Sequence, residues 1–373
     1  MKQKTKILWG VCGIGHGHTF RQKPLIEHFS KEAEIVILAY GESYDVFTKY
    51  FDKHKNVSIE RVAVPFYVGN QYGLDFEATA IHPANQNINF RKINAAALDA
   101  AIQRLGKPDL VISDYEPISA QYAYLHDAPL VTIDQQSKYL TGHFPQPLNG
   151  QWFNDEIERL RMFFPKAEKR LASTFFKVVQ KTDTSENVDL CPPVLSDEII
   201  SLQRKSAQGN KSIVVYISSQ QPFGQSVDAI IEACRTQPDY QFHIFGKGLN
   251  IETPPENILN IHFYDQGDPA FHEQLSVCDG IVSTAGHTLL SEAMYLGIPV
   301  YAIPLPVYEQ QMNAHIIHEN GFGVSHLHFD KDILASFIKN VPRYAANIKA
   351  DKNVLLRTDG RDHIIEQLNA QLS

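Results

Sequence analysis

Cysteine is scarce in this chain, and long apolar runs are missing from it. Its 373 residues include four cysteines, Cys12, Cys191, Cys234 and Cys278, which lie far apart and form no CxxC pair. This spacing predicts neither a disulfide framework nor a zinc knuckle, and it is typical of the reduced thiols of a cytoplasmic protein. No run of about 18 apolar residues is present, so no membrane-spanning helix is expected.

The N-terminus also lacks the pattern of a secretory signal. Lys2, Lys4 and Lys6 precede an apolar run that glycines and histidines soon interrupt. We therefore expect a cytoplasmic protein. Peripheral contact with the inner face of a membrane stays open, because residues 151–181 interleave basic and aromatic side chains. The same stretch is also typical of one or two helices with a solvated basic face.

An excess of positive charge is absent as well. Lys and Arg number 34 against 42 Asp and Glu, which gives a formal net charge of −8. A protein that neutralises nucleic-acid phosphates needs a basic face, so no nucleic-acid partner is expected, although a local basic patch stays open. A composition of 43% apolar and 20% charged residues is that of a globular protein, and the length predicts two domains.

Short apolar runs alternate with helical patterns along the chain. KILWGVCG, EIVILAY, PDLVISD and APLVTID have the composition of buried parallel strands. After Pro192 and Pro193 the rhythm restarts with SIVVYIS, YQFHIFG, NILNIHF, DGIVS and IPVYAIP. This alternation predicts an α/β fold of two Rossmann-like, doubly wound domains that face a cleft. The expected ranges are 1–188 and 198–350 for the domains, 189–197 for the linker, and 351–373 for a helix that closes back toward the first domain.

A turn of small residues follows the predicted strand DGIVS. The turn, STAG at residues 283–286, leads into the helical pattern HTLLSEAMYLG from His287. Free amide N–H groups and the positive end of the helix dipole make such a helix start suited to a diphosphate. Glu292, one turn beyond Thr288, would then accept hydrogen bonds from two vicinal hydroxyls. The alternative is that the turn only caps the helix and that Glu292 lies in solvent.

Beyond this helix the sequence continues with Gly297, Pro299 and a proline-rich stretch that carries Glu309-Gln310 and then Asn313-Ala314. From Ser283 onward the whole pattern resembles the donor-sugar signature of GT-B glycosyltransferases. That family includes transferases that use nucleotide-diphosphate glucose or glucuronic acid, and the lipid-linked N-acetylglucosamine transferase of peptidoglycan synthesis.

The resemblance implies roles for residues around the donor. Glu292 would hold the ribose diol, and Glu309 and Gln310 would hold hexose hydroxyls. Phe263 and Tyr264 end a predicted strand where the family presents backbone to the nucleobase, although an aromatic pair there is also typical of ordinary core. The diphosphate would lie on five consecutive residues: Thr284, Ala285, Gly286, His287 and Thr288.

Two shorter matches to the same family lie earlier in the second half. ISSQ ends the first predicted strand of that half and resembles the family's Ser-Gln phosphate turn, at Ser219 and Gln220. FGKG resembles a Gly-Lys-Gly loop near the donor, at Gly246 and Lys247. Both would add binding residues for the donor.

Three glycines follow the first predicted strand, in GVCGIGHGHTFR. Gly13, Gly15 and Gly17 permit a tight turn and a close approach of backbone to a ligand, which makes Gly15 and Gly17 candidate binding residues. A dinucleotide fingerprint would require GxGxxG and an acid at the end of the second strand. His18 stands at the third glycine position and Glu42 matches the acid only loosely, so a nicotinamide cofactor is not expected.

In the GT-B family a Gly-His at this turn begins the first helix and supplies the catalytic base. The match falls on His18, with His16 left as an alternative. A neutral imidazole accepts a proton near neutral pH, as is required when an acceptor hydroxyl attacks an anomeric carbon. Related transferases place an acid behind the imidazole at the position of Asp114, where it would fix the tautomer. The alternative is that Asp114 caps the next helix.

No metal site is predicted. His315 and His318 share a helical face but lack a third ligand, so we interpret them as a surface or packed pair. Residues 330–332, DKD, imitate the DxD metal motif of the other glycosyltransferase fold, and we interpret Asp330 as a helix N-cap. The GT-B resemblance implies a metal-independent reaction with no cofactor besides the nucleotide-sugar substrate.

These patterns together predict a hexosyltransferase. It would move a hexose from a nucleotide-diphosphate sugar, expected to be a UDP-sugar, to an acceptor hydroxyl with inversion of the anomeric centre. The expected partners are this donor and a small-molecule, glycan or lipid-linked acceptor. Two alternatives stay open: a sugar-nucleotide epimerase on the same fold, and a non-catalytic protein that binds nucleotide sugars.

Overall fold

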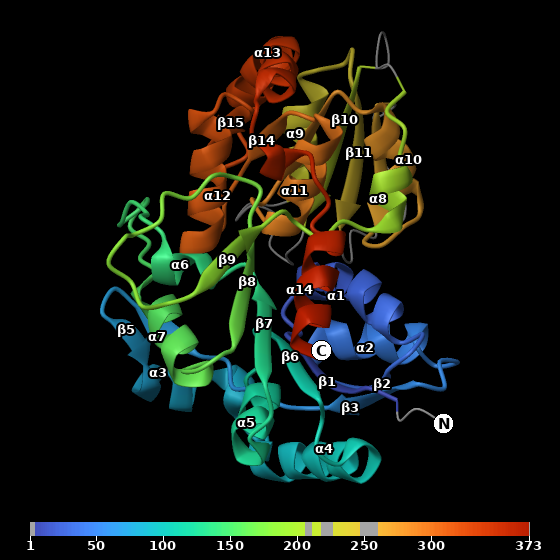
Figure 1. Ribbon diagram of the computed structural model, residues 1–373. Coiled ribbons are helices and arrows are strands. Elements are labelled where there is room, and N and C mark those ends of the chain that lie inside the picture. The colour runs from blue at the N-terminus through green and yellow to red at the C-terminus, as the bar shows by residue number, and fades with distance from the viewer. Residues whose placement is uncertain (1–3, 206–210, 218–226, 247–259, 373) are drawn as a thin grey trace. The chain divides into compact units, whose positions relative to one another are not determined.

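The computed structural model describes residues 4–205, 211–217, 227–246 and 260–372 (Figure 1). The chain divides into two compact units. The first comprises Met1–Pro147, Trp152–Ser196 and Asp359–Ser373, and the second comprises Leu148–Gln151 and Asp197–Thr358.

The first unit is built on a parallel sheet of seven strands in the order β3-β2-β1-β6-β7-β8-β9. Because helices cover both faces, its central strands are apolar on both sides, as parallel strands generally are. The strands are β1 (Lys6–Val11), β2 (Glu34–Ala39), β3 (Val57–Arg61), β6 (Leu110–Asp114), β7 (Leu130–Asp134), β8 (Lys169–Ser173) and β9 (Val188–Cys191).

Two helical layers cover this sheet. Ile7 and Trp9 of β1 face a core formed with α1 (His16–Phe29), α2 (Gly41–Tyr50) and α14 (Arg361–Leu372). Leu8, on the other face, joins a core with α4 (Phe90–Leu105), α5 (Pro117–His126) and α7 (Asn154–Phe163). The remaining elements of the unit are short: β4 (Val68–Asn70), β5 (Gly73–Asp75), α3 (Phe76–Ile81), the 3-10 turn Pro83–Asn85 and α6 (Lys138–Thr141).

The last helix of the chain belongs to the core of the first unit. Ile364 and Leu368 of α14 are fully buried beside residues of α1 and β1. Figure 1 shows α14, at the red end of the colour range, lying beside α1 near the blue end. The two ends of the sequence are thus packed into one hydrophobic core.

The second unit has a parallel sheet of six strands in the order β12-β11-β10-β13-β14-β15. These are β10 (Ser212–Ile217), β11 (Gln241–Gly246), β12 (Ile261–Asp265), β13 (Gly280–Ser283), β14 (Val300–Ala302) and β15 (Gly323–Ser325). Its helices are α8 (Asp197–Ser201), α9 (Val227–Arg235), α10 (Ala270–Val277), α11 (His287–Leu296), α12 (Tyr308–Glu319) and α13 (Lys331–Ala350), with a 3-10 turn at Val354–Leu356. The prediction of two doubly wound parallel sheets is therefore confirmed.

One interpretation from the sequence holds only for part of its stretch. The aromatic and basic stretch at residues 151–181 was expected to form one or two helices, and it contains α7 followed by the strand β8. Arg170 of β8 is buried, where its Nη2 donates to the Phe164 carbonyl at 2.5 Å and its Nε lies 3.3 Å from Glu186. Part of the apparent basic face is thus internal.

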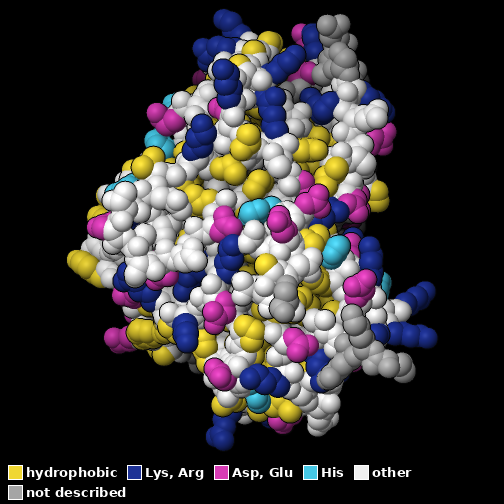
Figure 2. Space-filling view, in the orientation of Figure 1, with side chains coloured by type: hydrophobic (Ala, Val, Ile, Leu, Met, Phe, Trp, Pro, Cys, Tyr) yellow, Lys and Arg dark blue, Asp and Glu magenta, His cyan; other side chains and the backbone are white. Residues whose placement is uncertain are grey.

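The face shown in Figure 2 carries basic side chains over α13. Lys339, Arg343 and Lys349 are exposed along α13. Figure 2 shows basic side chains gathered over this helix, with charges of both signs interspersed lower on the same face. None of the helices described is both long and apolar enough to cross a membrane.

Candidate active site

The order of strands places two sequence-distant turns together in the first unit. β1 lies between β2 and β6, so the chain runs outward in opposite directions from the β1–β6 pair. In open α/β sheets, ligands bind beyond the carboxyl ends of the strands at this point of reversal. His18 lies in the first turn of α1, directly after β1, and Asp114 is the last residue of β6.

Glycine is required in the turn between β1 and α1. A Cβ at Gly13 would lie 1.7 Å from the Tyr40 carbonyl oxygen, and Gly15 has a positive φ of 71°. The Gly15 N–H donates to Oε2 of Glu42 at 3.0 Å, so this amide is already hydrogen-bonded to a carboxylate of α2. Gly17, the other predicted binding glycine, lies inside the first turn of α1.

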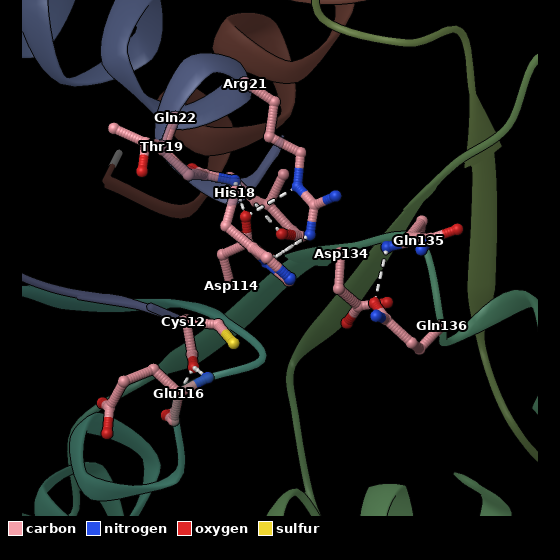
Figure 3. Close-up of polar contacts among 12 residues, drawn as sticks. Cys12, His18, Thr19, Arg21, Gln22, Asp114, Glu116, Asp134, Gln135 and Gln136 are labelled. Carbon is pink, nitrogen blue, oxygen red and sulfur yellow. Dashed lines mark hydrogen bonds and ion pairs between the residues drawn. The ribbon is translucent and has the colours of Figure 1, made fainter. Parts of the chain in front are cut away.

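The structure brings His18 and Asp114 into contact. His18 Nδ1 lies 2.9 Å from Oδ1 of Asp114, whose side chain is fully buried, while 12% of the His18 side chain is exposed (Figure 3). Asp114 does not cap α5. That cap is Glu116, which accepts from the Ile118 and Ser119 amides at 2.7 Å each. The carboxylate of Asp114 is therefore available to orient the imidazole.

Two further residues of α1 hold Asp114, and neither was predicted from the sequence. Arg21 Nε donates to Oδ2 at 2.7 Å and Arg21 Nη2 donates to Oδ1. Gln22 Nε2 donates to Oδ2 at 2.9 Å, and Gln22 Oε1 accepts from Trp9 Nε1 at 3.0 Å. His18, Arg21 and Gln22 stand at positions i, i+3 and i+4, which share one helical face. That spacing was the signal available in the sequence.

Burial and charge set the protonation of this group. Burial by itself would raise the pKa of Asp114, but Arg21 and His18 hold that pKa at about 2, so the carboxylate is ionised. Burial lowers the pKa of His18, and the positive charge of Arg21 lowers it further. Cys12 and Asp114 act in the opposite direction, and together they raise the pKa of His18 to about 10. The pKa of Cys12 is lowered against the effect of burial, chiefly by His18.

Cys12 and His18 therefore titrate as a coupled pair. The Cys12 thiol affects the pKa of His18 only when it is ionised, so one proton is held either by the sulfur or by the imidazole. Cys12 Sγ also lies 3.1 Å from the Tyr40 hydroxyl. When the thiol keeps the proton, the imidazole is neutral and able to accept another.

The alternative base, His16, has different surroundings. Its ring lies 5.8 Å from the ring of Phe20, and its Nδ1 has no hydrogen-bond partner among the residues described. Asp114 bonds His18 instead. The geometry thus favours His18 over His16 as the oriented imidazole.

In the second unit, the turn from β13 to α11 presents a helix start. Gly286 is the N-cap of α11 and makes no side-chain capping hydrogen bond, while the Ser283 hydroxyl donates to the Thr284 carbonyl at 2.7 Å. The N-cap position of this helix is thus Gly286 and not Ser283 or Thr284. β13 lies beside β10 at the point of reversal in its own sheet, the position equivalent to that of β6 in the first unit.

Glu292 lies on α11 and is half-buried, not in solvent. Burial raises its pKa to about 8, with a smaller contribution from Glu198. At neutral pH the unliganded side chain thus favours the protonated form. A carboxyl group in this state can both donate and accept a hydrogen bond.

Glu309 and Gln310 lie in the first turn of α12, which begins at Tyr308. Gln310 Oε1 accepts from the Leu305 amide at 2.9 Å and so fixes the preceding loop. Asn313 Nδ2 donates to the Ala285 carbonyl at 3.0 Å. This bond ties α12 to the turn before α11, so the predicted hexose and diphosphate residues belong to one hydrogen-bonded assembly.

Some of the remaining predicted donor residues lie on strands of the second sheet, and others lie outside the residues described. Gly246 ends β11, and Phe263 and Tyr264 lie on β12. The Tyr264 ring stacks on Phe245 with centroids 4.5 Å apart, and its hydroxyl lies 3.1 Å from His243 Nδ1. The Tyr264 side chain thus contacts other side chains of the same sheet. Three predicted residues lie outside those described: Ser219, Gln220 and Lys247.

Neither sequence motif that imitates a metal site belongs to a group of metal ligands among the residues described. Oδ1 of Asp330 accepts from the Asp332 and Ile333 amides at 2.8 and 3.0 Å, so its prediction as an N-cap is confirmed. Within the described ranges, no three His, Cys, Asp or Glu side chains are grouped so that they could hold a metal ion.

Comparison with known families decides the class of protein. Residues 5–342 match Glycosyl transferase family 1. The chain belongs to this family. It is a glycosyltransferase with the GT-B fold, as the resemblance in the sequence implied.

Similar proteins match most or all of this chain. This chain is 23% identical to an uncharacterized glycosyltransferase of Methanosarcina mazei, over 85% of this chain and 84% of that one. A UDP-glucosyltransferase from Polygonum tinctorium capable of glucosylating indoxyl has a TM-score of 0.67 at 12% identity, with 99% of each chain covered. MurG of Acinetobacter baumannii has a TM-score of 0.61 at 14% identity, with 99% of this chain and 100% of that chain covered. At these identities, the two structural likenesses establish the fold alone.

Proposed function

We propose that this glycosyltransferase moves a hexose from a nucleotide-diphosphate sugar, a UDP-sugar in particular, to an acceptor hydroxyl, with inversion and without a metal ion. The observation that carries the proposal is the contact of His18 with Asp114 where β1 and β6 end. It supplies one oriented imidazole at the ligand-binding edge of the sheet, which is what a single displacement needs.

In the proposed reaction, His18 acts as the base. Its Nδ1–H donates to Asp114, which leaves Nε2 to accept the proton of the acceptor hydroxyl. The hydroxyl oxygen forms the new bond to the anomeric carbon as the bond from that carbon to the diphosphate oxygen breaks. One displacement at one carbon inverts its configuration, and the nucleoside diphosphate leaves with the electron pair.

The donor is assigned to the second unit. The start of α11 at Gly286 supports a diphosphate site over residues 284–288, because amide N–H groups and the helix dipole at a helix N-terminus favour an anion. Glu292 is proposed for the ribose hydroxyls. Glu309 and Gln310 are proposed for the hexose, and the name of the Polygonum tinctorium relative supports UDP as the nucleotide.

The other partners are proposed more broadly. The acceptor is a small molecule, a glycan or a lipid-linked sugar, and no cofactor beyond the donor is required. All four cysteines are free and buried, which supports a reducing cytoplasmic environment. Peripheral contact with a membrane, and the absence of a nucleic-acid partner, stay predictions from the sequence.

The test is an assay of the purified protein with a panel of nucleotide sugars. Release of nucleoside diphosphate is measured with and without candidate acceptors and with and without EDTA, and the anomeric configuration of the product is read by NMR. We expect acceptor-dependent release that survives EDTA and an inverted product. A retained configuration or loss of turnover in EDTA would contradict the mechanism, and conversion of the sugar nucleotide without an acceptor would favour an epimerase.

A further inference from the structure

Arg21 contacts both members of the proposed catalytic pair, and the mechanism above gives it no role. Arg21 is 5% exposed, and its guanidinium binds both carboxylate oxygens of Asp114. Its Nη2 also lies 2.7 Å from His18 Nδ1. Figure 3 shows the guanidinium beside the imidazole and the carboxylate together. An arginine that contacted Asp114 from the solvent side would not also contact His18.

The chemistry of arginine determines what this contact does. A guanidinium donates hydrogen bonds, never accepts them, and keeps its charge at every physiological pH. Beside His18 it is a like charge, which disfavours the imidazolium. Beside Asp114 it offsets the negative charge that would otherwise stabilise the imidazolium. Both effects favour the neutral imidazole.

We propose that Arg21 is a positioning residue, which pairs with Asp114 so that the carboxylate orients His18 and stabilises its protonated form less than an unpaired carboxylate would. Asp114 alone would orient the ring and also trap the proton that a base must release. With Arg21 bound to it, the buried Arg21–Asp114 pair has no net charge. The proposal rests on the function proposed above, since it concerns the base of that reaction.

Other titratable groups act around this site. Cys12 raises the pKa of His18, Tyr40 bonds Cys12, Glu116 interacts with Tyr40, and Asp134 interacts with Arg21. These groups are present in every variant compared below. Differences between variants therefore report the effect of Arg21 and Asp114 themselves.

The experiment is an NMR titration of His18 in the full-length protein without substrate. Histidine is labelled with ¹⁵N, and His18 is assigned from the signal missing in His18→Gln. We expect the pKa of His18 to rise by about one unit or more in Arg21→Gln, because a like charge is lost, and to fall in Asp114→Asn. The double variant Arg21→Gln/Asp114→Asn should return close to the wild-type pKa, since both site charges are then absent. Arg21→Lys keeps the charge and should change the pKa less than Arg21→Gln.

A structural role alone would not give this pattern. If Arg21→Gln fails to fold, wild type, Asp114→Asn and the double variant still provide the test, because the second change must reverse the effect of the first on the pKa. No change in Arg21→Gln, or a change of the same sign in both single variants, would overturn the proposal.

Kinetics then connect the titration to turnover. The pH profile of kcat/KM should move to higher pH in Arg21→Gln. Below the pKa of His18, each tenfold rise in its proton affinity should lower kcat/KM by about tenfold, with recovery above that pKa. Absence of any transfer by the wild-type protein would defeat the proposed function and leave the titration result intact. Conversely, normal transfer with an unchanged His18 pKa in Arg21→Gln would defeat only the role of Arg21.

Discussion

The imidazole of His18 is held through one of its two nitrogens. Nδ1 meets Asp114, and this contact joins residues 96 positions apart in the chain. The other nitrogen, Nε2, is the one that a mechanism can use. An imidazole fixed in this way is pre-organised, so removal of the side chain should affect the chemical step much more than the binding of the donor.

The first prediction concerns that side chain. His18→Ala should lower kcat by about 10²- to 10⁴-fold, the usual contribution of a general base, with the dissociation constant for UDP unchanged. Steady-state assays and calorimetry measure the two quantities. His16→Ala is the matched control on the same turn and should keep most of the activity. Full activity in His18→Ala, with loss in His16→Ala, would transfer the role to His16.

The second prediction concerns Cys12. The ionised thiol raises the pKa of His18, so its removal in Cys12→Ala should lower that pKa and keep the imidazole neutral at lower pH. The acidic limb of the kcat/KM profile should therefore move to lower pH. Cys234→Ala removes a buried thiol of α9 and serves as control, with an unmoved profile. A profile in Cys12→Ala that matches wild type would show that the two groups do not share a proton.

The strands of this protein were predictable where one apolar run forms one strand. KILWGVCG contains β1, and EIVILAY contains β2, because each is buried on both faces of a parallel sheet. β8, with the sequence KRLAS, was missed. Its first residues are basic, and burial of Arg170 depends on the Phe164 carbonyl and on Glu186, contacts that no local pattern reveals.

The same limit applies to the site. His18 and Asp114 were found because a family resemblance connects two turns that a local pattern cannot connect. Arg21 and Gln22 were missed because their partner lies 93 and 92 residues further along the chain. Their spacing from His18 predicts a shared helical face, but only the strand order shows that Asp114 lies opposite that face.

The start of α5 gives the third prediction. Burial raises the folded-state pKa of Glu116 to about 7 from 4.5, against the hydrogen bonds from Ser119 and Ile118. A group with a raised folded pKa binds its proton more tightly when folded, so its contribution to stability is full below pH 4.5 and is lost as pH rises through about 7. Glu116→Gln does not titrate.

The melting temperature of Glu116→Gln, relative to wild type, should therefore increase between pH 5 and pH 8, as measured by calorimetry across that range. Glu366→Gln, the same change at an exposed position of α14, is the control. A difference for Glu116→Gln that stays constant, or decreases with pH, would show that the amide hydrogen bonds outweigh burial at this cap.

The chain as a whole returns to its first unit after completing the second. Segment Asp359–Ser373 belongs to the first unit, although residues 197–358 lie in the other. Gly360 is close to the backbone just before that excursion, since a Cβ there would lie 2.1 Å from the Pro192 carbonyl oxygen. Arg361 Nη2 donates to the Leu195 carbonyl at 2.8 Å. The outgoing and returning segments are thus bonded together.

The last prediction tests whether this return stabilises one unit and leaves donor binding alone. Leu368 is fully buried in the core formed with α1 and β1, so Leu368→Ala should lower the free energy of unfolding by about 2–5 kcal/mol. Glu366→Ala, exposed on the same helix, should change it by less than about 0.5 kcal/mol. Denaturant titration gives both values. The residues assigned to the donor lie in the second unit, so the affinity for UDP measured under native conditions should be equal in both variants. A large loss of UDP affinity in Leu368→Ala would mean that the donor site depends on the core of the first unit.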